Sequence, residues 1–301
     1  MMLRPIARFF YQHPNLSLAL LLAIPLLWLG IIYFASLFAL LLQSFFRLDD
    51  FTGQVIREFS LSSYKQLFHP ANLDIILRTV LMALAVSLMC AFLAFPLAYK
   101  MAKSQFWLKS LLYLLVLMPL WSSYVVRVYS WKLILAKEGV ISYTVKLLHL
   151  EWLLKWVLSL PLIGGPSLSV SLLGTFIVFV YIWLPYMVLP IAAAIERIPQ
   201  SLIEASQDLG GHGGQTFWKI IFPLALPGVV AGSIFTFSLT LGDFIIPGII
   251  GNSQFFLGQV VLLQQGTAGN IPLAAAFSVV PMLIMAIYLT LAQRMGAFRA
   301  L

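Results

Sequence analysis

Residues 204–223 read EASQDLGGHGGQTFWKIIFP, a polar segment in an otherwise apolar part of the chain. It holds two acids, a lysine, a histidine and four glycines. The runs on either side of it, Ser171–Ile195 and Leu224–Ile250, contain one charged residue between them. Because about 20 consecutive apolar residues are enough for a helix to cross a bilayer, both runs are expected to span a membrane. The polar segment is then a loop that stays outside the lipid.

The composition of the whole chain is typical of a membrane protein. Of its 301 residues, 61% are hydrophobic and 9% are charged, and the mean hydropathy is +0.99. Since soluble domains carry about 25% charged residues, a soluble fold is excluded. The net charge of +8 comes from basic residues scattered between apolar runs, which indicates membrane flanks rather than a nucleic-acid-binding patch. The single cysteine, Cys90, cannot form an internal disulfide.

Six apolar runs have the length of a membrane span. They cover Leu16–Gln43, Thr79–Lys100, Leu108–Val126, Ser171–Ile195, Leu224–Ile250 and Leu273–Ala292. The first run is too long for the apolar core of a signal peptide and has no small-residue cleavage site, so it is expected to be a retained helix. The sequence therefore predicts an all-α integral membrane protein with six transmembrane helices.

A seventh apolar stretch, Leu147–Ile163, is interrupted by charge, because Glu151 and Lys155 lie inside it. Each charge at the centre of a spanning helix costs about 2.5–3.5 kcal/mol. This stretch is therefore expected to be an amphipathic helix that lies at the membrane interface.

Six spans place both ends of the chain on the same side of the membrane. Basic residues crowd the short segments on that side, whereas equally many basic residues on the other side are diluted in two long loops. Since short basic segments set the orientation, both termini are predicted to be cytoplasmic. Residues 1–15 and 293–301 are then cytoplasmic segments, residues 16–43 are the first transmembrane helix, and residues 44–78 are an outer loop.

The polar loop itself is predicted to contain a short helix. Pro199 and Ser201 mark its start. Gly210 and Gly211 mark its end, because glycine readily adopts the positive φ that ends many helices. These features alone would also suit a solvated connector.

The same loop resembles the signature loop of permease subunits in ATP-binding-cassette (ABC) importers. In that signature, Glu-Ala-Ala is followed after three residues by glycine and after nine more by Ile-x-Leu-Pro. The chain matches it with Glu204, Ala205, Ser206, Gly210, Ile220, Phe222 and Pro223. Serine replaces the second alanine and phenylalanine replaces the leucine, and both are mild changes in size.

This resemblance implies a mechanical contact with a separate ATPase. The coupling residues would be Glu204, Ala205, Ser206, Gly210, Ile220 and Pro223. The Glu204 carboxylate would pair with a basic residue in a cleft of the ATPase, and the small Ala205 and Ser206 would let the helix enter that cleft. Closure of the ATPase on ATP would then move the helix and rock the attached spans.

Other segments resemble the spermidine/putrescine-type permeases of this class. They are SFFRLDDFTG (44–53), SLSSYKQLF (60–68), MPLWSSYVVRVYSWKLIL (118–135), ERIPQSLIEASQDLGG (196–211) and LTLGDFIIPGIIG (239–251). The resemblance implies a type I importer in the bacterial inner membrane, with residues 79–292 as its five-helix domain, 196–222 as the coupling loop and 44–78 on the periplasmic side. It also implies a heterodimer with a second permease, two ATPase subunits and a periplasmic binding protein. ATP and Mg would bind the ATPase, and this chain would hold no cofactor.

Asp243 is the only acid within a predicted span. Ionisable groups inside a membrane usually face a cavity or a partner, so Asp243 is a candidate for the translocation pathway. Trp121, Tyr124 and Tyr129 lie near the outer end of the third span and could offer their ring faces to a cation. The alternatives are an Asp243 wetted at the interface and an aromatic interfacial belt.

Catalysis, nucleotide binding and a metal site are not expected in this chain. The glycines of GGHGG (210–214) are not followed by the lysine and hydroxyl of a P-loop. The four histidines are far apart and none has metal-ligand spacing. The sequence therefore predicts a non-enzymatic membrane protein, and the resemblance to the spermidine/putrescine-type permeases implies a permease for polyamines. The alternatives are the same class of transporter for another small amine or amino-acid derivative, a secondary transporter, and a non-transporting membrane scaffold.

Overall fold

The computed structural model describes residues 14–49, 51–161, 163–252 and 254–294. The predicted cytoplasmic segments 1–15 and 293–301 lie mostly outside the described residues. The described chain consists of helices and loops, apart from one antiparallel hairpin in the loop after the first span, formed by β1 (Arg47–Leu48) and β2 (Val55–Ile56). The predicted helical fold is thus confirmed.

Five helices of the described chain are long and apolar enough to cross a membrane. They are α2 (Pro14–Leu27) with η1 (Trp28–Phe34) and α3 (Ala35–Gln43); α5 (Pro70–Lys103); α10 (Leu172–Glu196); α12 (Gly213–Thr216) with η4 (Phe217–Ile221) and α13 (Phe222–Gly242); and α16 (Ile271–Arg294). To within one residue, these helices contain four of the predicted spans, at 16–43, 79–100, 171–195 and 273–292.

The third predicted span, Leu108–Val126, is wrong as a continuous helix. Its elements are α6 (Phe106–Leu117), the 3₁₀ turn η2 (Met118–Trp121) and α7 (Tyr124–Ile134), and α7 leaves at an angle of 96°. Ser122 and Ser123 have extended ψ angles of 152° and 135°. Because Pro119 has no backbone N–H to donate and the Ser122 hydroxyl bonds the Pro119 carbonyl oxygen (2.9 Å), the helical ladder weakens and ends here.

The fifth predicted span, Leu224–Ile250, is also wrong as one helix. α13 ends at Gly242, and the short α14 (Ile245–Ile249) follows it. Asp243 between them is extended (φ −73°, ψ 134°), and its Oδ1 accepts N–H bonds from Ile245 (2.7 Å) and Ile246 (2.9 Å). These bonds begin a new helical turn. Asp243 therefore lies at the junction of two helices and not inside a spanning helix.

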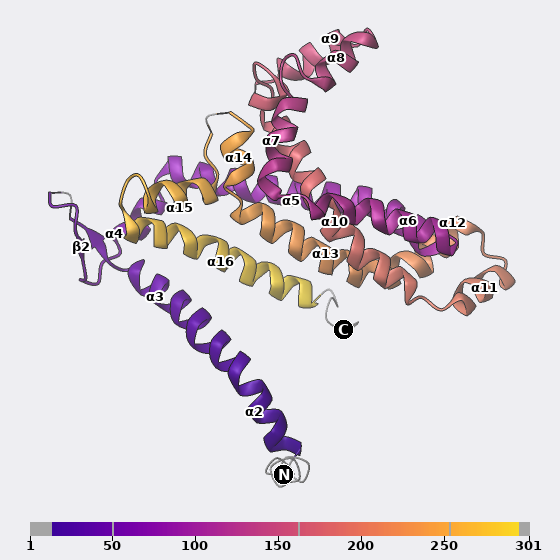
Figure 1. Ribbon diagram of the computed structural model, residues 1–301, viewed down its shortest axis with the longest axis horizontal. Coiled ribbons are helices and arrows are strands. Elements are labelled where there is room, and N and C mark those ends of the chain that lie inside the picture. Colours follow the sequence, from indigo (N-terminus) through magenta and orange to yellow (C-terminus); the bar gives the residue numbers. More distant parts are fainter. Residues whose placement is uncertain (1–13, 50, 162, 253, 295–301) are drawn as a thin grey trace, which may run out of the picture.

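The core is formed by α5, α10 and α13, which pack against one another, while α15 (Leu257–Gln265) and α16 pack together beside α5 and α13 (Figure 1). Two glycines of α13 permit its close approach to α10. A Cβ atom at Gly228 would lie 2.6 Å from the Pro190 carbonyl oxygen, and one at Gly232 would lie 2.6 Å from the Met187 sulfur. Small residues commonly have this role between membrane helices.

The remaining helical elements lie around this core. They are α4 (Ser62–Leu67), α8 (Val140–Leu147), α9 (Glu151–Leu158), the 3₁₀ turn η3 (Leu168–Val170) and α11 (Gln200–Asp208). The arm formed by α7, α8 and α9 projects from the bundle (Figure 1). In α9, Trp152, Lys155 and Trp156 are exposed, whereas Leu154 and Leu158 pack against the core. With eight residues α9 is too short to span a bilayer, and its place at the interface stays a prediction.

The bend between α6 and α7 makes the number of membrane crossings testable. From Ala71 at the start of α5 to His212 before α12, the chain crosses three times if the bent pair is one span and twice if it is a re-entrant loop. We expect single cysteines at these two exposed positions, in a Cys90→Ser background, to react with an impermeant thiol reagent from opposite faces. Position 212 should react from the cytoplasmic face. Labelling of both from one face would establish the re-entrant loop.

Candidate functional site

The loop between α10 and α13 holds the residues expected to contact an ATPase, and its first half is α11. This helix ends in a turn with two hydrogen bonds: Gly210 N–H donates to the Gln207 carbonyl oxygen (2.9 Å) and Gly211 N–H to that of Ser206 (2.8 Å). Gly210 has a φ of +79°, a conformation that other residues rarely adopt. The glycines therefore end this helix as the sequence predicts.

The surface of α11 that carries the signature residues is open. Glu204 and Ala205 are exposed, whereas Ile203 is buried beneath them. The hydroxyls of Ser206 and Thr216 share a hydrogen bond (2.9 Å) that joins α11 to α12. As Figure 1 shows, α11 lies at one end of the molecule, beyond the packed spans, where another protein can reach it.

The second half of the loop is anchored on α5. The Phe217 ring contacts Phe95 (5.5 Å between centroids) and Tyr99 (6.2 Å). Ile220 is half-buried in η4, and Pro223 is exposed in the first turn of α13. Ile220 and Pro223 thus belong to the anchored half, and the exposed Glu204 belongs to α11.

Asp243 and Tyr124, two of the candidate pathway residues, contact each other near α14. The Tyr124 hydroxyl donates a hydrogen bond to Asp243 Oδ2, while Oδ1 holds the two backbone N–H groups of α14. The Tyr124 ring stacks on Trp183 of α10, with centroids 5.6 Å apart and an interplanar angle of 23°. A cavity of about 310 Å³ is lined by these three residues together with Ser238, Leu239, Gly242, Phe244 and Ile245.

The other two aromatic candidates do not line this cavity. Trp121 is 75% exposed at the end of η2, and Tyr129 is 53% exposed on α7. Trp183 takes their place, although nothing in the sequence distinguished it. In the sequence, a tryptophan in the middle of an apolar run cannot be distinguished from a residue that only packs in the core. Tyr124 contacts Trp183 only because the chain bends before α7.

Arg127 adds a positive charge next to Tyr124. Its guanidinium carbon lies 6.0 Å from the centroid of the Tyr124 ring, a distance at which a cation and an aromatic face attract each other. Its Nε and Nη1 atoms are buried and have no hydrogen-bond partner within the described chain. Tyr124 therefore has a carboxylate at its hydroxyl and a guanidinium beside its ring.

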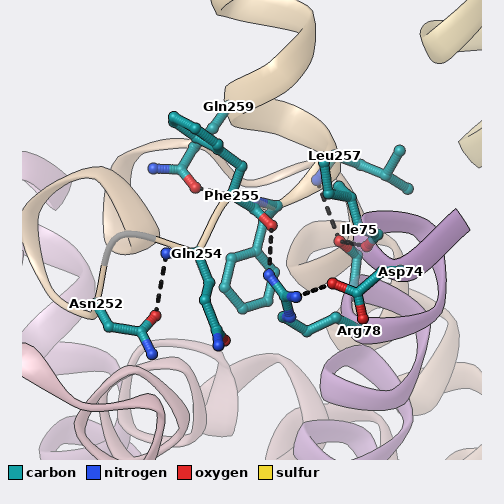
Figure 2. Close-up of polar contacts among 10 residues, drawn as sticks. Asp74, Ile75, Arg78, Asn252, Gln254, Phe255, Leu257 and Gln259 are labelled. Carbon is teal, nitrogen blue, oxygen red and sulfur yellow. Dashed lines mark hydrogen bonds and ion pairs between the residues drawn. The ribbon is translucent and has the colours of Figure 1, made fainter. Parts of the chain in front are cut away.

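A second polar cluster joins the start of α5 to the loop before α15 (Figure 2). Arg78 pairs with Asp74 one turn earlier and donates through Nη1 to the Phe255 carbonyl oxygen (3.3 Å). Leu257 N–H donates to Thr79 Oγ1 (3.1 Å). These bonds hold the loop beside a cavity of about 490 Å³, which is lined mainly by apolar side chains of α5 and α10.

Comparisons with known proteins agree on one family. The family described as "Binding-protein-dependent transport system inner membrane component" matches residues 83–297. The Escherichia coli (strain K12) protein "Inner membrane ABC transporter permease protein YdcU" is 52% identical over 297 residues, 98% of this chain and 95% of that protein. "Spermidine/putrescine transport system permease protein PotB" of Salmonella typhimurium (strain LT2) is 31% identical over 270 residues, 89% of each chain.

Solved structures share the fold. A chain of the bacterial alginate ABC transporter, in complex with an alginate pentasaccharide-bound periplasmic protein, superposes with a TM-score of 0.71. The match covers 96% of both chains at 14% identity. At this identity the likeness concerns the fold alone.

The turn at Gly210 gives a prediction about the end of α11. A side chain in the left-handed region costs about 1–2 kcal/mol, so Gly210→Ala should make hydrogen exchange of the Leu209–Gly211 amides about 5–30-fold faster. Gly213→Ala is the matched control, because its φ is not positive and no atom lies within 4 Å of the added Cβ. Exchange measured by mass spectrometry on the purified protein compares the two variants. Equal exchange in both would mean that the Gly210 conformation does not limit the turn.

Proposed function

The chain belongs to the family of binding-protein-dependent transport system inner membrane components, and from this we propose that it forms half of the path by which an ABC importer moves polyamines into the cell. It is a non-catalytic, membrane-spanning permease subunit. The substrates proposed are putrescine and spermidine. The similarity to permeases named for spermidine and putrescine supports this choice.

The observation that carries the proposal is the carboxylate of Asp243 beside the stacked rings of Tyr124 and Trp183. A polyamine carries two or more ammonium groups, and moving them through an apolar path without a counter-charge is costly. A carboxylate and aromatic faces at an open cavity offset part of this cost. Because the Asp243 carboxylate already accepts three hydrogen bonds, its attraction for an ammonium group of the substrate is weakened, so that the substrate can be released.

A second candidate substrate class is an amino-acid derivative such as γ-aminobutyrate. Arg127 favours it, since the Nε and Nη1 donors of its guanidinium are buried without a partner in the described chain and the group lies near the same tyrosine. A carboxylate on the substrate would suit this guanidinium. The two classes are separated by measuring which compound the cognate binding protein binds.

For the assembly we propose a heterodimer with a second permease, two ATPase subunits on the cytoplasmic side and a binding protein on the periplasmic side. Both termini then lie in the cytoplasm, and α11 enters a cleft of the ATPase. ATP and Mg bind the ATPase subunits. The exposed Glu204 and the anchored Phe217 support this arrangement, because a lever needs one free end and one end fixed to the spans.

Charge reversal tests the contact at α11. Loss of one partner of a buried ion pair costs about 3–5 kcal/mol, so Glu204→Lys should weaken association with the ATPase by orders of magnitude. The variant should still insert in the membrane, since Glu204 lies outside the spans. Glu138→Lys, at an exposed position between α7 and α8, is the control. Co-purification of the ATPase is the measurement, and full recovery with Glu204→Lys would contradict the proposed contact.

Asp243→Asn tests the carboxylate in the pathway. The asparagine oxygen can still accept the N–H bonds of Ile245 and Ile246, so the junction stays intact while the charge is lost. We expect assembly and basal ATP hydrolysis to be retained and polyamine uptake to fall by about tenfold, the equivalent of about 1.4 kcal/mol. Asp243→Glu should retain more uptake than Asp243→Asn.

The measurement is uptake of radiolabelled putrescine into vesicles, normalised to assembled complex. Uptake equal to that of the wild type in Asp243→Asn would remove the charge from the pathway. Parallel loss of assembly and uptake would assign Asp243 to the fold alone.

A further inference from the structure

We propose that Glu196 joins α6 to α10, so that these two helices follow α11 as one body during the transport cycle. The inference rests on one part of the proposed function, the contact of α11 with a separate ATPase. It assigns a positioning role to Glu196, Lys109 and Tyr113. None of them is one of the signature residues between Glu204 and Pro223, and none lines the cavity near Asp243.

The contact is made by a single carboxylate oxygen. Glu196 is the last residue of α10, and its Oε1 lies 3.0 Å from Lys109 Nζ and accepts a hydrogen bond from the Tyr113 hydroxyl (2.8 Å). Lys109 and Tyr113 are four residues apart and so lie on one face of α6. Nearby, Lys103 at the end of α5 donates to the side chain of Gln200 at the start of α11 (3.1 Å). The corner between α10 and α11 is thus tied to α5 and α6.

The position of Glu196 is unfavourable for α10 by itself. The C-terminal end of a helix carries partial negative charge, so a carboxylate is repelled there. Lys109 and Tyr113 of the neighbouring helix offset that repulsion. The side chains of Lys109 and Glu196 are 35% and 31% exposed, and ion pairs as exposed as this add little to stability. A role in positioning explains the cluster better than a role in stability.

α6 needs such a connection because it is packed loosely. None of the twelve described residues of α6 is buried. By contrast, α10 buries residues along its whole length against α5 and α13. Three partly buried residues of α6, Leu112, Tyr113 and Val116, are its contacts with this core, so movement of α10 would pass only weakly to α6 through apolar packing. The bonds to Glu196 supply a directional connection at the end nearest α11.

The connection reaches the proposed substrate site along two helices. α6 continues through η2 and the bend to Tyr124, and α10 carries Trp183, which stacks on Tyr124. If both helices move together, the rings of Tyr124 and Trp183 stay stacked while the cavity opens or closes. If α6 lags behind, the stacked pair and the Tyr124–Asp243 hydrogen bond are disturbed instead.

The experiment measures the movement directly in the complex of both permeases and the ATPase. Spin labels are placed at Val126, exposed on α7 just after the bend, and at Leu291, exposed on α16, in a Cys90→Ser background. In the wild type, the distance distribution is expected to shift when ATP and vanadate are added. Glu196→Lys should reduce this shift by at least half. It should also lower substrate uptake per ATP hydrolysed, by about two- to tenfold.

Charge exchange separates positioning from stability. A lysine suits the C-terminal end of a helix, so Glu196→Lys does not weaken α10 itself. The double variant Lys109→Glu, Glu196→Lys restores the ion pair with opposite signs and should recover most of the shift and the coupling ratio. Glu58→Lys, which breaks the exposed Arg47–Glu58 pair (3.4 Å) in the outer loop, should behave as the wild type.

Each outcome is decisive. A full shift in Glu196→Lys, or a double variant with no larger shift than Glu196→Lys, would overturn the inference. A wild-type complex that shows the shift but takes up no polyamine would refute the proposed substrate alone. Absence of the shift in the wild type would refute the coupled movement.

Discussion

Backbone groups that leave a helix inside a bilayer must find partners within the protein, because lipid offers none. Asp243 meets this requirement where α13 stops. Its carboxylate accepts hydrogen bonds from the first two backbone N–H groups of α14 and from the Tyr124 hydroxyl. One side chain thus provides partners for the free backbone groups and holds α7 in place. The cavity, the Tyr124–Trp183 stack and the approach of α7 to α14 all depend on this junction.

The sequence predicted the parts of this fold that depend on average polarity. Apolar length was sufficient to locate the spans at 16–43 and 171–195, and the pair Gly210–Gly211 was sufficient to end α11. The breaks at Ser122 and Asp243 were not predictable in this way. Hydropathy averaged over about 20 residues hardly changes when the backbone of one or two residues is extended. Trp183 was missed for a related reason, since its role comes from a ring that the bend brings to it.

The end of the molecule that carries α11 combines an exposed element with a fixed one. α11 is attached through Ser206 and by the corner at Glu196, whereas the turn at Phe217 is held by aromatic contacts on α5. A push on α11 is therefore transmitted through polar bonds on one side and through packing on the other. Hydrogen bonds have a preferred direction, whereas packed aromatic rings resist compression. The polar contacts of α11 and the packed Phe217 ring therefore respond differently to the same force.

The first span belongs to none of the buried clusters, and only its last part, α3, lies beside another spanning helix, α16. None of the described side chains between residues 17 and 43 is buried, although this segment and α5 are the two most apolar of the candidate spans. During synthesis this helix leaves the ribosome before any of the spans it could pack against, and the later helices build their core without it. Its insertion is thus a separate event from the folding of the bundle. The apolar surface of this helix can be covered only by lipid or by another polypeptide, and until then it is accessible to the proteases and chaperones of the membrane.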